Sequence, residues 1–343
     1  MDNNKLIHPH DKFFKDAFSR INVIRSFVEY YLFPEDKAII DPLTLEAVRD
    51  THINPELQEL FSDMVYAGLT PDGSERVYLL FEHKSYPDRR VGVQLQENIA
   101  MVLQYHQRQH GRESIPIVLS IVIGLGQSVW DTGIQPVYHF VPYEKHRRIF
   151  PDLRFTVIDL SAITNDQIRG VAYLRILFLT LKYIHNPGLP EKIKDIIVIF
   201  KELNDDPEAP EYFKVLMKYL EGTTKENLFL KLQDKIKRTL NEGGDQMSRL
   251  LEGVLEDIIK KRLEETAAKS RQEGRQEGWR EGLKIGEERG IKQGIEKEKR
   301  ISTLEIAGRM ISNGLNDEIT SKVTGLTLQQ VQKLRNGGGA QGM

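Results

Sequence analysis

Apolar residues near the start of the chain change from helical spacing to strand-like spacing. Between residues 13 and 33 they recur every three or four positions, and the Pro34 that follows cannot continue a helix. Residues 60–66 and 77–84 have the composition of strands, and the Pro-Asp-Gly sequence at 71–73 favours a turn with positive φ at the glycine. The pattern predicts one helix followed by a β-hairpin.

The next segment predicts a second helix and then a buried strand. Residues 91 to about 109 are amphipathic at helical spacing. The β-branched apolar run IPIVLSIVI at 115–123 is typical of a strand that is buried on both faces. Shorter strand candidates follow at 137–141 and 155–160. This succession predicts an α/β fold with a mixed sheet flanked by helices.

Beyond about residue 166 the apolar spacing is helical throughout. Amphipathic helices are predicted at 171–184, 191–203, 210–220, 225–240 and 246–263. Glycine then recurs at every fourth position from Gly274 to Gly294, among Arg, Lys, Glu and Gln. Such a tract is either a self-association helix, whose small residues permit close backbone approach, or a charged, partly helical spacer.

The chain ends in a segment with short helices predicted at 303–312, 317–323 and 328–335. Thr327 and Gln330 have the spacing of a capping box. The segment is compatible with a DNA-reading helix-turn-helix, although its last helix offers few cations, or with a packing unit that caps an oligomer.

Composition narrows the classes of function. A hydrophobic content of 40% in 343 residues is enough for at least one buried core. The net charge of −2 provides no overall positive field, so a nucleic-acid partner would be held locally or through a metal ion. The absence of cysteine excludes disulfides, thiolate zinc sites and cysteine nucleophiles, and fits a reducing compartment. With neither a signal-peptide pattern nor a membrane-length apolar run, we expect a cytoplasmic protein that does not associate with a membrane.

Charged residues interrupt both strands of the predicted hairpin. Alternation along 77–84 places Glu82 and Lys84 on one face, and Asp63 lies in an otherwise apolar strand, where an uncompensated carboxylate is costly. Two carboxylates on adjacent strands offer the oxygen ligands that Mg²⁺ prefers, and Lys84 would orient a water molecule or stabilise developing charge. The alternative is an ordinary salt bridge on a solvated face.

Several segments of the first half resemble a known family. They are HDKFFKDAF, FSDMVY with Asp63, LLFEHKS with Glu82 and Lys84, YPDRR, and a helix followed by IPIVLSIVI. Together they resemble the recombination-promoting nuclease and transposase-like family, a branch of the PD-(D/E)xK nucleases, over roughly residues 8 to 160. The resemblance implies a restriction-endonuclease-like fold and an endonuclease dependent on Mg²⁺, with Mn²⁺ as a substitute. It also implies that Asp63 and Glu82 are metal ligands, that the backbone carbonyl of His83 is a third, and that Lys84 is the catalytic lysine.

With this resemblance the chain divides into four predicted regions. They are a PD-(D/E)xK nuclease core at 1–165, a helical region at 166–265, a Gly-repeat charged helix or spacer at 266–300, and a small helix-turn-helix-like segment at 301–336.

Residues beside the predicted trio are candidates for contact with DNA. Arg89 and Arg90 follow the catalytic strand, and arginine donates paired hydrogen bonds to phosphate oxygens. Gln94 on the following helix is a further candidate. For all three the alternative is ordinary surface polarity. Asp11 and Asp16 on the first helix either add an acidic group to the site or belong to a solvated face.

Two classes of function remain after motif analysis. The sequence lacks GxxxxGK[ST], GxSxG and HExxH, so nucleotide, serine and zincin hydrolysis lose their usual support. The first hypothesis is a Mg²⁺-dependent DNA endonuclease, active as a homo-oligomer formed through the C-terminal region and linked to recombination, mobile elements or defence. The second is a non-catalytic, oligomeric DNA-binding or scaffolding protein that retains the nuclease fold.

Overall fold

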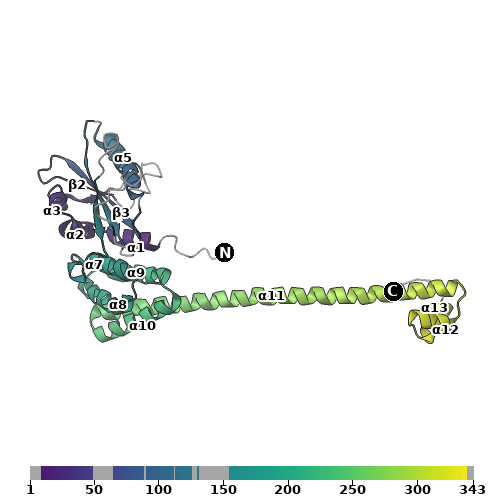
Figure 1. The fold of residues 1–343 in the computed structure, drawn as a ribbon. Helices are drawn as coiled ribbons and strands as arrows, with labels where there is room; N and C mark the ends of the chain where they lie inside the picture. Colours follow the sequence, from purple (N-terminus) through teal and green to yellow (C-terminus); the bar gives the residue numbers. More distant parts are fainter. Residues whose placement is uncertain are drawn as a thin grey trace. The chain divides into compact units, whose positions relative to one another are not determined.

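Figure 1 shows the computed structural model, which describes residues 9–48, 65–88, 90–111, 113–125, 130 and 154–337. Contacts divide the chain into two compact units, residues 1–259 and 260–343. The finer four-part division of the chain stays a prediction. Among the described residues, none of the helices combines the length and the apolar character that a membrane span requires.

The first apolar segment forms two helices, α1 (Pro9–Phe18) and α2 (Ile21–Tyr31), so the single helix predicted over residues 13–33 is wrong. The backbone of Arg20 is extended, with φ −90° and ψ 118°. The Ser19 hydroxyl and the Arg20 guanidinium both donate to the carbonyl of Asp16, so side chains satisfy the end of α1. Apolar spacing continues across the break because both helices bury one face in the same core.

Two short helical elements lead from α2 to the sheet. Pro34 stands in the first turn of α3 (Pro34–Lys37), a position where its missing N–H costs no helical hydrogen bond. The 3₁₀ turn η1 (Pro42–Thr44) follows, capped by the side chain of Asp41.

The sheet has five strands in the order β1-β2-β3-β4-β5. They are β1 (Glu46–Ala47), β2 (Val65–Leu69), β3 (Arg76–Lys84), β4 (Ile117–Gly124) and β5 (Thr156–Asp159). The first two pairings are antiparallel and the last two are parallel, which makes the sheet mixed as predicted. The β2–β3 hairpin is confirmed, with Gly73 at φ +74° in its turn. The strand candidate at 137–141 and the first part of the one at 60–66 lie outside the described residues.

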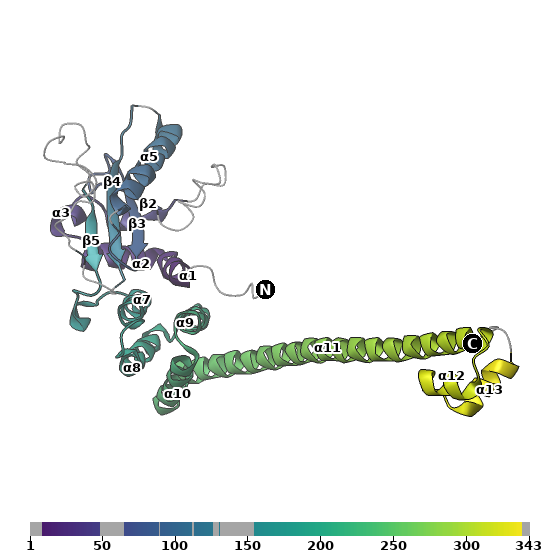
Figure 2. The same cartoon turned by 45° about the vertical axis from the view of Figure 1, so that its right-hand side comes forward.

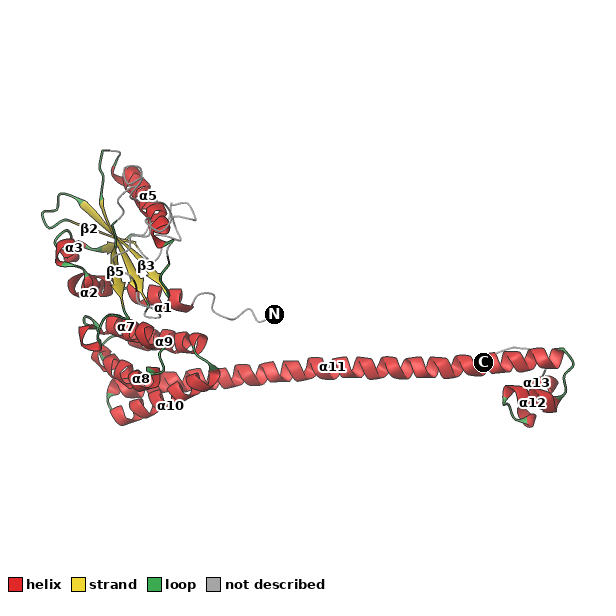
Figure 3. Ribbon diagram, viewed as in Figure 1, coloured by secondary structure: helices red, strands yellow, loops and turns green. Residues whose placement is uncertain are grey.

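Helices cover both faces of the sheet, as Figures 2 and 3 show. Helix α5 (Val91–His110) connects β3 to β4 and packs on the face that carries Tyr78 and Leu80. The opposite face, with Leu79 and Phe81, packs on α1 and α2. The predicted α/β class, with helices flanking a mixed sheet and a helical region after it, is confirmed.

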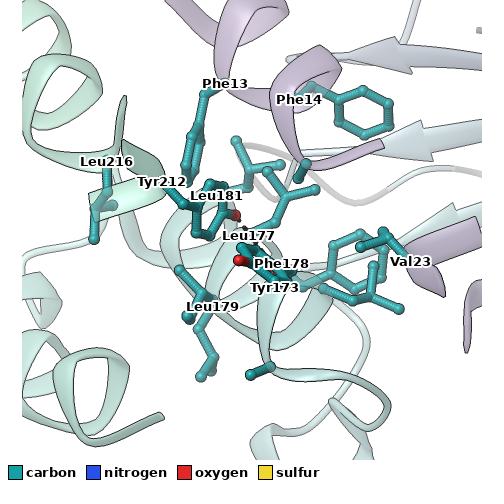
Figure 4. Close-up of a cluster of buried hydrophobic side chains, with 14 of the residues drawn as sticks. Phe13, Phe14, Val23, Tyr173, Leu177, Phe178, Leu179, Leu181, Tyr212 and Leu216 are labelled. Atoms are coloured by element: carbon teal, nitrogen blue, oxygen red, sulfur yellow. Dashed lines mark hydrogen bonds between the residues drawn. The ribbon is translucent and has the colours of Figure 1, made fainter. Parts of the chain in front are cut away.

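The helical region follows a 3₁₀ turn, η3 (Asn165–Gln167). It comprises α7 (Ala172–Tyr183), α8 (Leu189–Ile199), η4 (Phe200–Leu203), α9 (Ala209–Thr223), α10 (Glu226–Gly243) and α11 (Gln246–Ser312). These helices share one hydrophobic cluster with α1 and the sheet. In Figure 4, Phe13 of α1 lies against Tyr212 of α9, whose hydroxyl donates to the backbone carbonyl of Tyr173 on α7 at 3.1 Å.

The second half of α11 differs from the prediction at one boundary. The glycine tract is helical throughout, and the separate helix predicted at 303–312 is the end of α11. Nothing interrupts the chain between these segments, because residues 246–312 contain no proline. Two short helices follow, α12 (Asp317–Thr324) and α13 (Leu328–Asn336), and the Thr327–Gln330 capping box is confirmed.

Candidate active site

The central strand β3 ends in the residues of the predicted site. Alternation along the strand is confirmed, since Tyr78 and Leu80 pack on the α5 side and Leu79 and Phe81 on the other. Glu82 and Lys84 continue the α5 side. The parallel strand β4 pairs with this end of β3, where Glu82 lies opposite Val122 and Lys84 opposite Gly124. The backbone carbonyl of Lys84 accepts a hydrogen bond from the N–H of Leu125 at 2.9 Å.

Glu82, Lys84 and Gln94 form a closed hydrogen-bonded ring. The Lys84 ammonium donates to Gln94 Oε1 at 2.7 Å, and Gln94 Nε2 donates to Glu82 Oε2 at 3.1 Å. Lys84 Nζ also lies 3.3 Å from Glu82 Oε1. Because an amide has one accepting and one donating end, only one orientation of Gln94 satisfies both neighbours. The ring therefore fixes all three side chains relative to one another.

The segment between β3 and α5 brings Gln94 to the strand. Asp88 accepts a hydrogen bond from the N–H of Arg90 at 2.8 Å through its side chain, and one from Val91 at 3.1 Å through its backbone carbonyl. These bonds start α5 so that Gln94, in its first turn, faces the end of β3. Asp88 also reaches Lys84, with 3.5 Å between Oδ2 and Nζ.

The neighbouring side chains offset only part of the cost of burying the negative charge of Glu82. Its side chain is 17% exposed, and burial raises its pKa above the ordinary value. The Lys84 charge and hydrogen bonds from Lys84 and Gln94 act in the opposite direction, whereas Asp11 on α1 raises the pKa further. The net direction is upward, so one lysine does not offset the cost of burying this carboxylate. A further cation at this position would stabilise its ionised form.

His83 points to the other face of β3. Its ring stacks on Phe14 of α1 with 4.8 Å between ring centroids. Burial lowers the pKa of its imidazole to about 4, against a smaller opposing effect of Asp11. The side chain is therefore neutral near pH 7 and turned away from Glu82, which leaves the backbone carbonyl for the predicted role as a ligand.

Oxygen atoms gather around Glu82, but the described residues do not complete a metal site. Glu82, Asp88 and Gln94 offer oxygen atoms, the donor type that Mg²⁺ and Mn²⁺ take, but no group of three carboxylate or imidazole side chains in the described part of the chain is placed to hold a metal ion. The predicted second ligand, Asp63, lies outside the described residues. The donor chemistry fits, and the full ligand set stays a prediction.

Comparison with known proteins assigns the chain to a family. Residues 8–210 match the family model described as "Putative transposase, YhgA-like", which covers the sheet and the helices up to the start of α9. The chain belongs to the YhgA-like family.

Curated relatives of this YhgA-like chain carry nuclease names. It is 23% identical to the recombination-promoting nuclease RpnD of Escherichia coli O157:H7, over 56% of this chain and 74% of the relative. It is 24% identical to the recombination-promoting nuclease RpnA of Escherichia coli K12, over 53% of this chain and 62% of the relative. It is also 24% identical to the inactive recombination-promoting nuclease-like protein RpnE of the same strain, over 61% of this chain and 70% of the relative. No solved structure matches the chain.

Three further residues of the YhgA-like region are predicted to contact nucleic acid, namely Arg89, Arg90 and Gln94. Arg90 is exposed at the N-terminal end of α5, four residues before Gln94. Arg89 lies outside the described residues. Gln94 was predicted to contact nucleic acid, and the structure shows it bonded to Glu82 and Lys84, so a role in positioning these two is the one its contacts support.

Sequence reasoning underrated two carboxylates of this family member. The sequence analysis does not select Asp88, although aspartate commonly accepts a hydrogen bond from the N–H two residues later in a turn, as it does here. The sequence does not decide between two roles for Asp11, and the structure brings it close enough to act electrostatically on both Glu82 and His83. No signal in the sequence reveals that approach, because it depends on how α1 docks on the sheet.

Proposed function

We propose that the chain is a metal-dependent nuclease that hydrolyses phosphodiester bonds in DNA at the end of β3. The observation that carries the proposal is the closed ring of Glu82, Lys84 and Gln94, fixed at the end of a central strand in a chain whose relatives are named recombination-promoting nucleases. A solvated salt bridge needs no third residue to hold it, so the ring favours a site over ordinary surface charge.

The proposed cofactor is Mg²⁺, with Mn²⁺ as a substitute. Asp63, Glu82 and the backbone carbonyl of His83 would hold the ion. When bound, such an ion would polarise a phosphoryl oxygen and lower the pKa of a water molecule. The raised pKa of Glu82 supports this assignment, since a carboxylate buried beyond what its lysine compensates favours a second cation.

The side chains around this position have distinct proposed roles. Lys84 keeps its ammonium beside the reacting phosphate and stabilises the negative charge that develops there. Gln94 holds Lys84 and Glu82 at a fixed separation, which limits the motion of both groups before the substrate arrives. Arg89 and Arg90 would bind flanking phosphates of DNA.

Cleavage assays with matched variants test the proposal. The purified chain is incubated with supercoiled plasmid in Mg²⁺, Mn²⁺, Ca²⁺ or EDTA. We expect nicking or cutting with Mg²⁺ and Mn²⁺, little with Ca²⁺, and none in EDTA. Asp63→Ala and Glu82→Ala should abolish cleavage while the folded state persists. Glu97→Ala, which removes an exposed carboxylate on α5, is the control and should cleave normally. Wild-type rates in both site variants, with contaminating nuclease excluded, would refute the assignment.

A second candidate is a non-catalytic DNA-binding or scaffolding protein. It is favoured by the relative RpnE, whose name describes it as inactive although it matches this chain over a similar length. Retained DNA binding with no cleavage in any of the metals would select this candidate.

We also propose that the chain acts as a homo-oligomer assembled through its C-terminal region. Along α11, Trp279, Leu283, Ile291 and Ile295 each follow a glycine of the repeat and are 47–68% exposed. A second chain would remove this apolar surface from water, and the neighbouring glycines leave space for its backbone.

A further inference from the structure

The last two helices are joined by a short, fixed turn. Helix α12 ends at Thr324 and α13 begins at Leu328, so Gly325, Leu326 and Thr327 form the connection. Gly325 has φ +75°, a left-handed conformation that favours glycine. Two helices joined by a turn of three or four residues with a glycine are the pattern of a helix-turn-helix unit.

Hydrogen bonds hold the two helices in one arrangement. The Ser321 hydroxyl donates to the carbonyl of Leu326 at 2.7 Å, across the turn. The Arg335 side chain reaches back from α13 and donates to Asp317 Oδ1 at 2.7 Å and to the carbonyl of Leu315 at 2.5 Å. The capping box of Thr327 and Gln330 fixes the start of α13. Hydrogen bonds therefore hold both ends of α13 in place relative to α12 and the preceding loop.

A small core ties the unit to the end of α11. At the end of α11 and in each of the two short helices one residue is wholly buried, namely Ala307, Thr320 and Val331. In Figures 1 and 2, α12 and α13 fold back against the last turns of α11. All three residues are small or medium in size, which allows the helices to pack closely.

Apart from Leu328 at its first position, the exposed side chains of α13 are mainly amides and cations. Gln329, Gln332, Lys333 and Asn336 are exposed, and the helix LQQVQKLRN contains no carboxylate. This composition differs from the exposed tract of α11, where glutamate alternates with lysine and arginine. Amide side chains donate and accept together, which matches the edge of adenine in the major groove, and lysine contacts guanine or phosphate.

We propose that α12 and α13 form a helix-turn-helix that binds double-stranded DNA, with α13 in the major groove. The first turns of a recognition helix contact the base edges, which places Gln329 and Gln332 there and leaves Lys333 for a phosphate. This inference goes beyond the proposed nuclease site and does not depend on it, because the binding surface lies in the unit of residues 260–343.

The charge of the unit sets what kind of binding to expect. Lys322 and Lys333 are exposed, whereas Arg335 is engaged by Asp317. With few cations facing the phosphates, affinity falls only modestly with salt, and discrimination between sequences comes from the amides. A second copy of the chain is the competing occupant, since Ile319 and Val323 on α12 are 47% and 64% exposed.

Binding measurements on the full-length chain in EDTA, where cleavage does not interfere, test the proposal. A duplex is first selected by the wild-type chain from a random-sequence pool, and affinities are measured by fluorescence anisotropy. The test variant is Gln329→Ala/Gln332→Ala/Lys333→Ala. The matched control is Gln276→Ala/Gln293→Ala/Lys292→Ala, which removes the same groups from exposed positions on α11.

We expect the test variant to lose at least tenfold in affinity for the selected duplex, while the control binds as the wild type does. Circular dichroism and light scattering should be the same for all three proteins. Lys333→Ala alone should lower the salt slope of binding by about one. Unchanged affinity in the test variant, or no sequence enriched from the pool, would overturn the proposal. A lower assembly mass in the test variant would also overturn it and assign the face to a second copy.

Discussion

Lys84 has three acceptors around a single ammonium group: Gln94, Glu82 and Asp88. The contact with Gln94 Oε1 is a hydrogen bond at 2.7 Å, and those with Glu82 and Asp88 are ion pairs at 3.3 and 3.5 Å. The group is therefore held before any substrate binds. Arginine would not fit this arrangement, because its planar guanidinium presents its donors in a fork.

We predict that Lys84→Ala lowers turnover at least tenfold and leaves metal affinity largely unchanged. A tenfold loss corresponds to about 1.4 kcal/mol of transition-state stabilisation, a modest demand on a partly buried cation. Single-turnover cleavage and calorimetric titration with Mg²⁺ check the two parts. Lys84→Arg keeps the charge and should recover little activity. Metal affinity lost together with activity would make Lys84 a structural partner of Glu82.

At the scale of residues, the sequence predicted the site where it depends on strand alternation alone. Glu82 and Lys84 share a face, and His83 takes the other, as expected. The partners of these residues were not predictable, because they come from α1 and α5. Gln94 meets Lys84 only after the chain has turned at Asp88, and no periodicity describes that turn.

At the scale of elements, apolar spacing located the helices and strands better than their ends. It cannot detect the break at Ser19–Arg20, since α1 and α2 bury continuous faces in one core. Apolar spacing also does not predict the full length of α11. Six glycines within residues 274–294 each make the helix less favourable by about 1 kcal/mol relative to Ala. The absence of proline was the better signal there.

Asp245 caps the N-terminal end of α11, and its contribution to stability can be measured. Asp245 accepts hydrogen bonds from the N–H of Ser248 at 2.7 Å and from its hydroxyl at 3.0 Å, and it lies 2.8 Å from Lys201 Nζ. The hydrogen bond from Lys201, followed by those from Ser248, lowers the pKa of this carboxyl to about 2. We predict that Asp245→Ala costs about 1 kcal/mol, the usual worth of an N-cap.

Asp245→Asn separates the cap from the charge, because asparagine keeps the accepting oxygen. It should be less destabilised than Asp245→Ala. A carboxyl whose pKa is lower in the folded state stabilises that state above its unfolded pKa and loses the contribution as pH falls. The free energy of unfolding of the wild type should therefore be slightly larger than that of the Asn variant at neutral pH. This difference should vanish between about pH 4 and pH 2. Urea denaturation at several pH values decides, and a gap that widens in acid would contradict the assignment.

At the scale of the whole molecule, residues 1–259 depend on a junction between α1 and the helical region. The guanidinium of Arg20 lies over the rings of Tyr173 and Tyr212, at 4.4 and 5.1 Å from their centroids, and pairs with Glu208 at 3.1 Å. Such contacts with two aromatic faces favour a cation. No pattern in the sequence predicts this junction, because its members are far apart along the chain.

We predict that removing the residues after Leu263 leaves a folded domain that still binds metal but has a lower assembly mass. The truncated chain retains the whole cluster shared by the sheet and α7 to α10, and it loses the exposed apolar residues of α11. Light scattering of both forms measures the change. Trp279→Lys/Ile291→Lys in the full chain is the companion variant. An unchanged mass in both would show that the glycine tract is a spacer.

The glycines of α11 also affect how its backbone hydrogens exchange with solvent. Helices ordinarily fray from their ends, but here the segment with the lowest propensity, residues 274–294, lies inside the helix and no side chain packs on its glycines. At protein concentrations low enough to keep the chain unassembled, we expect its amides to take up deuterium faster than those on either side, at 246–260 and 301–312. Gly282→Ala/Gly286→Ala should slow that uptake, since a Cβ at either position meets no neighbouring atom within 4 Å. Uniform exchange along the whole helix would show that something outside this chain's own contacts protects its middle.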